Sequence, residues 1–301
     1  MRKLVLLALF GVVAQLVDGG LGMAYGLTSS TLLIAFGLAP AVASASVHMA
    51  EVGTTLASGI AHTRVGNTDW RTVRWLAVPG AIGAFTGAVV LSNLSAEMAK
   101  PIVSTFLLVL GIYLFVRFAV LGGKIKIQEG TISPFLLMPL GSIAGFLDAV
   151  GGGGWGPIST PTLLASGKME PRKAVGTVST SEFLVASAAS VGFLVALDTS
   201  TVALPVVGAL LVGGIIAAPL AATLVKYLNP RILGTMVGGL IIFTNGRTVL
   251  KAIGLSGDAL TAGLIALAAV WVVGLIYSIV KVRETSRVLS DERQLAMGAA
   301  D

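Results

Sequence analysis

Long apolar runs separated by short polar turns dominate the chain. A membrane-spanning helix needs roughly 20 consecutive apolar residues. The pattern therefore predicts seven spanning helices, at 43–61, 75–92, 101–118, 176–197, 203–225, 232–250 and 259–280. The polar stretches between these runs are too short to bury a core of their own.

Two further apolar regions, 4–37 and 135–166, are interrupted in the middle by glycine-rich sequence. The first carries Asp18-Gly19-Gly20, and the second runs through Asp148 to Gly156. Each half is shorter than a span, so we expect two broken, re-entrant helix hairpins. Irregular backbone at membrane depth must face a cavity or protein, and the N-terminal amides of half-helices that begin there attract anions. The breaks therefore predict an anion site at the membrane midplane.

Composition supports a lipid-embedded chain. Hydrophobic residues make up 55% of the 301 positions and charged residues only 11%, whereas soluble domains carry about 25% charged residues. The net charge of +6 is spread between apolar runs, so it does not predict nucleic-acid binding. The absence of cysteine excludes disulfides, thiolate metal sites and a cysteine nucleophile.

An internal repeat divides the chain in two. An offset of 131 aligns residues 22–61 with 153–192, and nine of the 40 pairs are identical, including Glu51 with Glu182. The predicted fold is an all-α polytopic membrane protein with two inverted repeats, each a broken hairpin plus three transmembrane helices. The divisions are repeat 1 at 1–118, a cytoplasmic linker at 119–133, repeat 2 at 134–250, an extra span at 259–280 and a cytoplasmic tail at 281–301.

The distribution of basic residues predicts the orientation. In the inverted arrangement 15 lysines and arginines fall on one side and five on the other. The side richer in lysine and arginine is cytoplasmic in most membrane proteins, so we expect a cytoplasmic C-terminus. Arg2 and Lys3 favour a cytoplasmic start instead, which would require the first segment to cross completely.

The second repeat resembles a known family. Its glycine run Gly151 to Pro157, the apolar Pro161 to Leu164, the basic turn Lys168 to Lys173 and the segment Ala174 to Ser179 are similar to the sulfite exporter TauE/SafE family. This family is also called the toluene-sulfonate uptake permease family. The resemblance covers roughly residues 10–250 and implies a secondary transporter of sulfite or organosulfonates.

Polar residues near the breaks and inside the spans are candidates for the substrate site. Glycine amides would hold the anion, hydroxyls on one helix face would donate to it, and two aromatic residues would wall it. For each hydroxyl, a hydrogen bond to a carbonyl oxygen of its own helix is an equal alternative. For the two aromatic residues, packing in the core is an equal alternative. The substrate-binding candidates are Gly20, Gly22, Tyr25, Ser46, His48, Gly152, Gly153, Trp155, Thr177 and Ser179.

Glu51 and Glu182 are the candidates for proton coupling. A carboxyl group buried at membrane depth can exchange protons near neutral pH and couple them to an anion. Alternatively, each glutamate caps the amides of a facing half-helix. His48 lies three residues before Glu51, but two ligands without a third do not predict a metal, and no cofactor is predicted.

The predicted function is a secondary transporter, an exporter of small sulfur-containing anions across the cytoplasmic membrane. An uncoupled anion channel or facilitator, or an importer of another small organic anion, remain alternatives. The chain lacks the G-x-S-x-G, H-E-x-x-H and Walker motifs, so we do not expect an enzyme. The expected partners are a small anionic substrate and the lipid bilayer, with a homo-oligomer left open and no nucleic acid.

Overall fold

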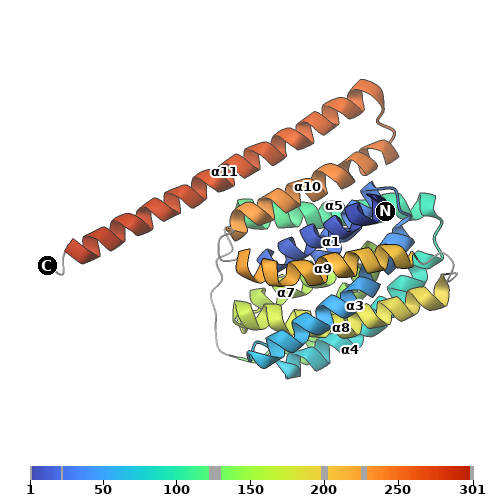
Figure 1. Cartoon of the computed structure of the whole chain (residues 1–301), viewed down its shortest axis with the longest axis horizontal. Coiled ribbons are helices and arrows are strands. Elements are labelled where there is room, and N and C mark those ends of the chain that lie inside the picture. The colour runs from blue at the N-terminus through green and yellow to red at the C-terminus, as the bar shows by residue number, and fades with distance from the viewer. Residues whose placement is uncertain (1, 22, 122–129, 198–202, 225–228, 299–301) are drawn as a thin grey trace.

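A computed structural model of the chain describes residues 2–21, 23–121, 130–197, 203–224 and 229–298. Within these residues the protein is helical and contains no strand (Figure 1). The described helices are α1 (Arg2–Leu21), α2 (Tyr25–Ala35), α3 (Pro40–Arg64), α4 (Trp70–Ser92), α5 (Ala96–Ala119), α6 (Pro134–Gly151), α7 (Trp155–Ala165), α8 (Pro171–Ala196), α9 (Leu204–Leu224), α10 (Pro230–Ala252) and α11 (Gly257–Gly298).

Helix starts follow from the local sequence. Proline occupies the first turn of α3, α6, α8 and α10, where its missing N–H leaves no helical bond unmade. The side chain of Asp69 accepts a hydrogen bond from the Arg71 amide at the start of α4, and Ser95 accepts one from the Met98 amide at the start of α5. These caps fix where the chain turns back into the bundle.

Glycines allow the main helix pairs to approach closely. A Cβ atom on Gly145 of α6 would lie 2.1 Å from the carbonyl oxygen of Gly80 on α4, and one on Gly213 of α9 would lie 2.1 Å from that of Ala8 on α1. Neither position tolerates a side chain. The pairs α4 with α6, α1 with α9, α5 with α10, α4 with α8 and α3 with α8 form most of the packing.

Six helices among the described residues are long and apolar enough to cross a membrane: α4, α5, α6, most of α8, α10 and the 257–285 part of α11. The sequence analysis took each half of the second interrupted region as too short to cross. This expectation was wrong for α6, which has 18 residues because the helix continues through Asp148 to Gly151. The α3 helix is not in this set, since buried polar residues lower its overall hydropathy.

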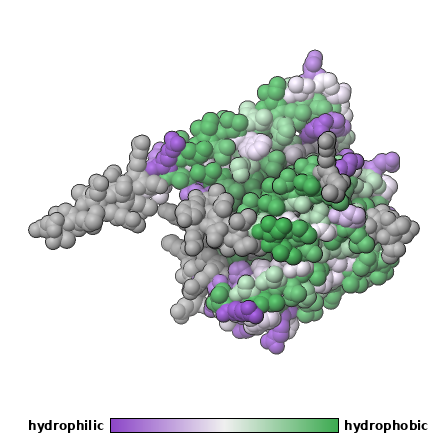
Figure 2. Space-filling model, viewed as in Figure 1, coloured by the Kyte–Doolittle hydropathy of each residue, from purple (hydrophilic) through white to green (hydrophobic). Residues whose placement is uncertain are grey.

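The surface matches a lipid environment. Large apolar side chains such as Ile82, Val109, Ile215 and Val273 are more than half exposed, and among the residues that Figure 2 colours, hydrophobic ones cover more of the surface than hydrophilic ones. A soluble surface with this much exposed apolar area would aggregate. The protein is therefore a multi-pass membrane protein.

The last helix extends beyond the rest of the bundle (Figure 1). The hydroxyls of Thr235 on α10 and Ser278 on α11 lie 2.8 Å apart and are buried, so the two helices are in contact along this stretch. The sequence ended the last span at residue 280, but α11 continues to Gly298. An ion pair of 2.8 Å between Lys281 and Glu284 supports this exposed part of the helix.

The two chain ends lie at opposite ends of the bundle. Figure 1 places the N-terminus near the turn from α10 into α11 and the C-terminus at the far end of α11. The α3 and α8 helices are antiparallel, because Ser58 near the end of α3 contacts Ser179 near the start of α8. The turns after α3 and before α8 therefore lie together at the end of the bundle opposite the N-terminus.

Candidate functional site

The two helix breaks meet in the interior of the bundle. Gly152 has a φ of +70° and Gly153 a φ of +155°, conformations that favour glycine. A Cβ atom on Gly153 would lie 2.0 Å from the amide nitrogen of Leu27 in α2. The hydroxyl of Ser30 donates to the carbonyl oxygen of Gly152. The break between α6 and α7 is therefore in backbone contact with the first turns of α2.

An aspartate caps the start of each short helix. One carboxylate oxygen of Asp148 accepts hydrogen bonds from the amides of Gly154 at 2.6 Å and Trp155 at 2.9 Å. Asp18 accepts in the same way from the amides at the start of α2, at 2.9 Å from residue 24 and 3.3 Å from residue 25. A negative charge at a helix N-terminus is stabilised by the amides and the helix dipole. The first free amides of both half-helices are therefore already bonded within the protein.

A small polar cavity lies between α1, α2, α3 and α8. It brings together four of the predicted residues, Tyr25, Glu51, Ser179 and Glu182. Five further residues line it: Gln15, Asp18, Thr54, Thr55 and Ser58. Its volume of about 20 Å³ has room for about one water molecule. Three carboxyl groups and no lysine or arginine line this cavity, so its chemistry suits protons and water.

His48 connects this cavity to the second helix break. Its Nδ1 lies 2.9 Å from Oε2 of Glu51, and its Nε2 lies 3.8 Å from Oδ2 of Asp148. All three side chains are at most 2% exposed. Neither Nε2 of His48 nor Oδ2 of Asp148 has a hydrogen-bond partner among the described residues. The imidazole therefore stands between two carboxyl groups that come from different halves of the chain.

Three of the predicted site residues have structural contacts instead. The hydroxyl of Ser46 donates to the carbonyl oxygen of Val42 one turn earlier, at 2.7 Å. Thr177 accepts a hydrogen bond from the amide of Asp69 at 3.0 Å, in the turn before α4. Trp155 is fully buried, and its Nε1 donates to the carbonyl oxygen of residue 178 at 3.2 Å.

Two of the predicted glycines belong to the first break. Gly20 is in the last turn of α1, and Gly22 lies outside the described residues. The contacts of the first break are made by Asp18, Ala24 and Tyr25.

Four hydroxyl groups that the sequence analysis did not select lie buried on the two short helices. Thr28 and Ser29 on α2, and Ser159 and Thr160 on α7, are at most 1% exposed. Their side-chain oxygens have no hydrogen-bond partner in the described part of the chain. The offset of 131 pairs Thr28 with Ser159 and Ser29 with Thr160, so the repeat itself was the signal that could have found them.

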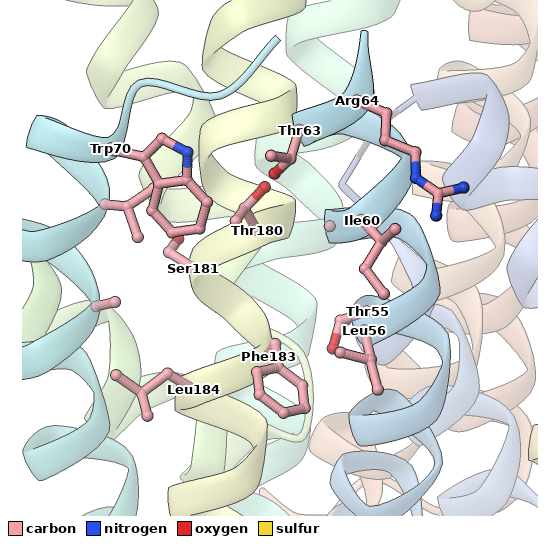
Figure 3. Close-up of a pocket in the computed structure, with 13 residues that line it drawn as sticks. Thr55, Leu56, Ile60, Thr63, Arg64, Trp70, Thr180, Ser181, Phe183 and Leu184 are labelled. Carbon is pink, nitrogen blue, oxygen red and sulfur yellow. The ribbon is translucent and has the colours of Figure 1, made fainter. Parts of the chain in front are cut away.

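A larger, mostly apolar pocket of about 400 Å³ adjoins the polar cavity and shares Thr55 with it. Figure 3 shows its walls, with Phe183 and Leu184 from α8, Leu56 and Ile60 from α3, and Trp70 at the start of α4. The pocket lies at the end of the bundle where α3 ends, opposite the N-terminus.

No group of three or more histidine and acidic side chains in the described ranges is placed to hold a metal ion. The chemistry of the site is therefore built from carboxyl groups, one imidazole and hydroxyls. Buried ionisable groups inside a membrane bundle line ion and proton pathways in transport proteins. The fold and this site together define a polytopic helical protein of the transporter class.

Comparisons with known proteins agree with this class. The family described as sulfite exporter TauE/SafE matches residues 7–248, and the chain belongs to this family. It is 52% identical over 252 residues to the "Probable membrane transporter protein YtnM" of Bacillus subtilis (strain 168), covering 83% of this chain and 84% of the relative. It is 25% identical over 178 residues to the "Probable membrane transporter protein YdhB" of the same organism, covering 59% and 71%. No solved structure matches the chain.

Proposed function

We propose that this protein is a secondary transporter that exports small sulfur-containing oxyanions, such as sulfite or organosulfonates, across the cytoplasmic membrane. Membership of a family described by sulfite export supports the substrate class and the direction. The mostly apolar surface and the similarity to probable membrane transporters support the location in a bilayer. The excess of basic residues on one side supports a cytoplasmic C-terminus.

The single observation that supports substrate binding is the set of four buried hydroxyls that have no hydrogen-bond partner among the described residues, Thr28, Ser29, Ser159 and Thr160. A buried polar group left without a hydrogen bond costs about 1–3 kcal/mol. An oxyanion that accepts hydrogen bonds from hydroxyls on both half-helices would remove this cost. The amides capped by Asp18 and Asp148 then hold the short helices in place rather than the substrate.

Two inverted repeats explain why both halves carry the same parts. Asp18 and Asp148 make matching contacts to amides six and seven residues later. The packing pairs α1 with α9 and α4 with α6 are also related by exchange of the two halves. In transporters built this way, one repeat moves relative to the other around a site at the midplane.

The polar cavity, which is lined by three carboxyl groups, supplies the coupling proton. Glu51 and Glu182 come from equivalent positions of the two halves and line the same cavity. His48 extends this chain of groups from Glu51 to Asp148, so a proton can be passed between the cavity and the start of α7. The offset of 131 pairs His48 with Ser179 in the second half. The histidine that joins two carboxyl groups is therefore present only in the first half.

A thermal-shift screen of the purified protein tests the substrate class. The ligands are sulfite, thiosulfate, sulfoacetate, taurine, sulfate, a carboxylate and chloride. A ligand that binds the folded state raises its apparent stability by mass action. We expect stabilisation by a sulfur oxyanion. Stabilisation by the carboxylate alone, or by no anion, would contradict the proposed substrate.

A pair of substitutions on α7 tests the role of the free hydroxyls. Thr160→Val removes an oxygen that has no partner within the described ranges, whereas Thr162→Val removes one that donates to the carbonyl oxygen of Ile158 at 2.7 Å. We expect Thr160→Val to weaken anion binding while leaving the stability without ligand unchanged or higher. Thr162→Val should keep binding. Equal anion binding by the two variants would contradict the assignment of the hydroxyls.

Flux in vesicles under an imposed pH gradient tests the coupling. Glu51→Gln and Glu182→Gln should slow proton-linked flux and keep anion binding, because both variants lose the exchangeable proton but keep similar shape. Asp258→Asn, on the exposed start of α11, is the matched control. If flux in the glutamate variants keeps the wild-type pH dependence, the carboxyl groups are structural and transport is uncoupled.

A further inference from the structure

A second large hollow lies at the end of the bundle that also holds the N-terminus. It is formed where α2 ends, α5 begins and α10 ends, and its volume is about 620 Å³. We call it the basic vestibule, because Lys100, Arg247 and Lys251 line it together with the single carboxylate Glu97. The basic vestibule is separate from the polar cavity, and the two share no lining residue.

The charges of the vestibule are not neutralised within the protein. Among the described residues, Lys100, Arg247 and Lys251 form no ion pair, and one carboxylate against three cations leaves an excess of positive charge. Like charges around one hollow repel each other, and a small anion between them relieves that repulsion. A concave site lined by one sign of charge also raises the local concentration of the opposite ion.

Buried polar groups continue inward from the floor of the vestibule. Ser104 lies one turn deeper than Pro101 on α5, Asn245 one turn deeper than Thr248 on α10, and Thr31 one turn deeper than Ile34 on α2. Residues three apart share a helix face. Nδ2 of Asn245 donates to the hydroxyl of Thr31 at 3.1 Å, and all three residues are at most 2% exposed.

The deepest of these groups reach the hydroxyls described above. The Ser104 hydroxyl has no partner within the described segments. Thr28, one turn deeper than Thr31 on α2, is also buried, and its hydroxyl has no partner in the part of the chain that the structure describes. The polar groups therefore extend from the vestibule towards the start of α2. Among the described residues, Glu97 is the only one with a carboxyl group that lines the vestibule.

We propose that the basic vestibule is the binding station through which the substrate anion passes on the side of the membrane opposite the C-terminus. This inference rests on the proposed function as an oxyanion transporter. The hollow is large enough for a hydrated anion, since a water molecule occupies roughly 30 Å³ of liquid. The exposed cations act on the encounter rate and are screened by salt. The anion and the coupling proton thus use different parts of the bundle.

The absence of cysteine makes the electrostatic potential of the vestibule directly measurable. A cysteine introduced by Thr248→Cys lies in the vestibule, and one introduced by Asn93→Cys lies exposed in the turn before α5 at the same end of the bundle. Each is reacted with a sulfonate-bearing and with a trimethylammonium-bearing methanethiosulfonate reagent, in vesicles of zwitterionic lipid. At each position the rate with the sulfonate reagent is divided by the rate with the trimethylammonium reagent. We expect this ratio to be on the order of tenfold higher at Thr248→Cys than at Asn93→Cys.

Neutralising the cations should remove this preference. The triple variant Lys100→Gln, Arg247→Gln and Lys251→Gln is compared with a control that loses three cations at the opposite end, Arg71→Gln, Arg74→Gln and Lys173→Gln. We expect the first triple variant to lose the preference and its dependence on salt, and the control to keep both. If the preference is absent in the wild-type background, or persists in the first triple variant, the proposal is overturned.

The readout separates this proposal from the proposed function, because the labelling rate needs no transport. No preference at Thr248→Cys together with flux of a sulfur oxyanion would overturn the vestibule and keep the transporter. A clear preference without flux of any sulfur oxyanion would keep an anion station and overturn the proposed substrate. An effect of the triple variant that appears only in vesicles of anionic lipid would mean that the cations bind lipid headgroups, which also overturns the proposal.

Discussion

The contact between the two helix breaks can be tested by adding one methyl group at Gly153. Its φ of +155° disfavours any L side chain, and a Cβ atom there would lie 2.0 Å from the amide nitrogen of Leu27 and 2.2 Å from the carbonyl carbon of Gly26. The positive φ costs about 1–2 kcal/mol. Because the opposing atoms are backbone, the clash adds roughly 1–3 kcal/mol. Gly153→Ala should therefore lower the free energy of unfolding by about 2–5 kcal/mol.

Two other glycines separate these contributions. Gly37 also has a positive φ, +103°, but no atom lies within 4 Å of a Cβ atom there, so Gly37→Ala should lower stability by about 1 kcal/mol. Gly208 lies inside α9 with open space around it, so Gly208→Ala should raise stability by about 0.5–1 kcal/mol through helix propensity. Unfolding by a denaturing detergent in mixed micelles gives the three values. Equal losses for Gly153→Ala and Gly37→Ala would refute the contact between the breaks.

Three further outcomes follow from single contacts. Trp155→Phe should lower stability by about 1 kcal/mol and keep anion affinity, because its ring packs and its N–H bonds a helix carbonyl; loss of affinity would make it a ligand. Asp69→Ala should lower the melting temperature through the lost cap, about 1 kcal/mol, with unchanged flux. A double-mutant cycle of Ser58→Ala and Ser179→Ala should give a coupling energy near 1 kcal/mol; additivity would show that the bond is absent.

The apolar pattern predicts an all-helical membrane protein, and the residues that the structure describes confirm it, because they form helices and no strand. The helix breaks near Gly22 and Gly152 follow from local chemistry, because glycine and proline interrupt helices wherever they cluster. The sequence did not predict the full length of α6, since an aspartate in an apolar run reads as an interruption. In the structure Asp148 stays helical and bonds amides beyond the break, so its charge is compensated by residues six and seven positions later.

The structure brings some of the residues selected from the sequence together and separates others. Tyr25, Glu51, Ser179 and Glu182 line one cavity. Helix periodicity and the internal repeat place Glu51 on α3 opposite Ser179 and Glu182 on α8, whereas Tyr25 reaches the cavity from the first turn of α2. Thr177 was selected by the same periodicity, yet it bonds the turn before α4. The sequence indicates which residues share a helix face, but it does not indicate which helix or turn packs against that face.

The sequence by itself therefore determined that the protein lies in a lipid bilayer, where its helices and helix breaks fall, and which residues the two halves share. These properties depend on apolar length and local conformation, which are written in short windows of the chain. The tertiary structure alone decided that His48 lies between Glu51 and Asp148, and that α2, α5 and α10 gather three cations around one hollow. His48 and Asp148 are 100 positions apart, and Lys100 and Arg247 are 147 positions apart, so they come together only when helices pack.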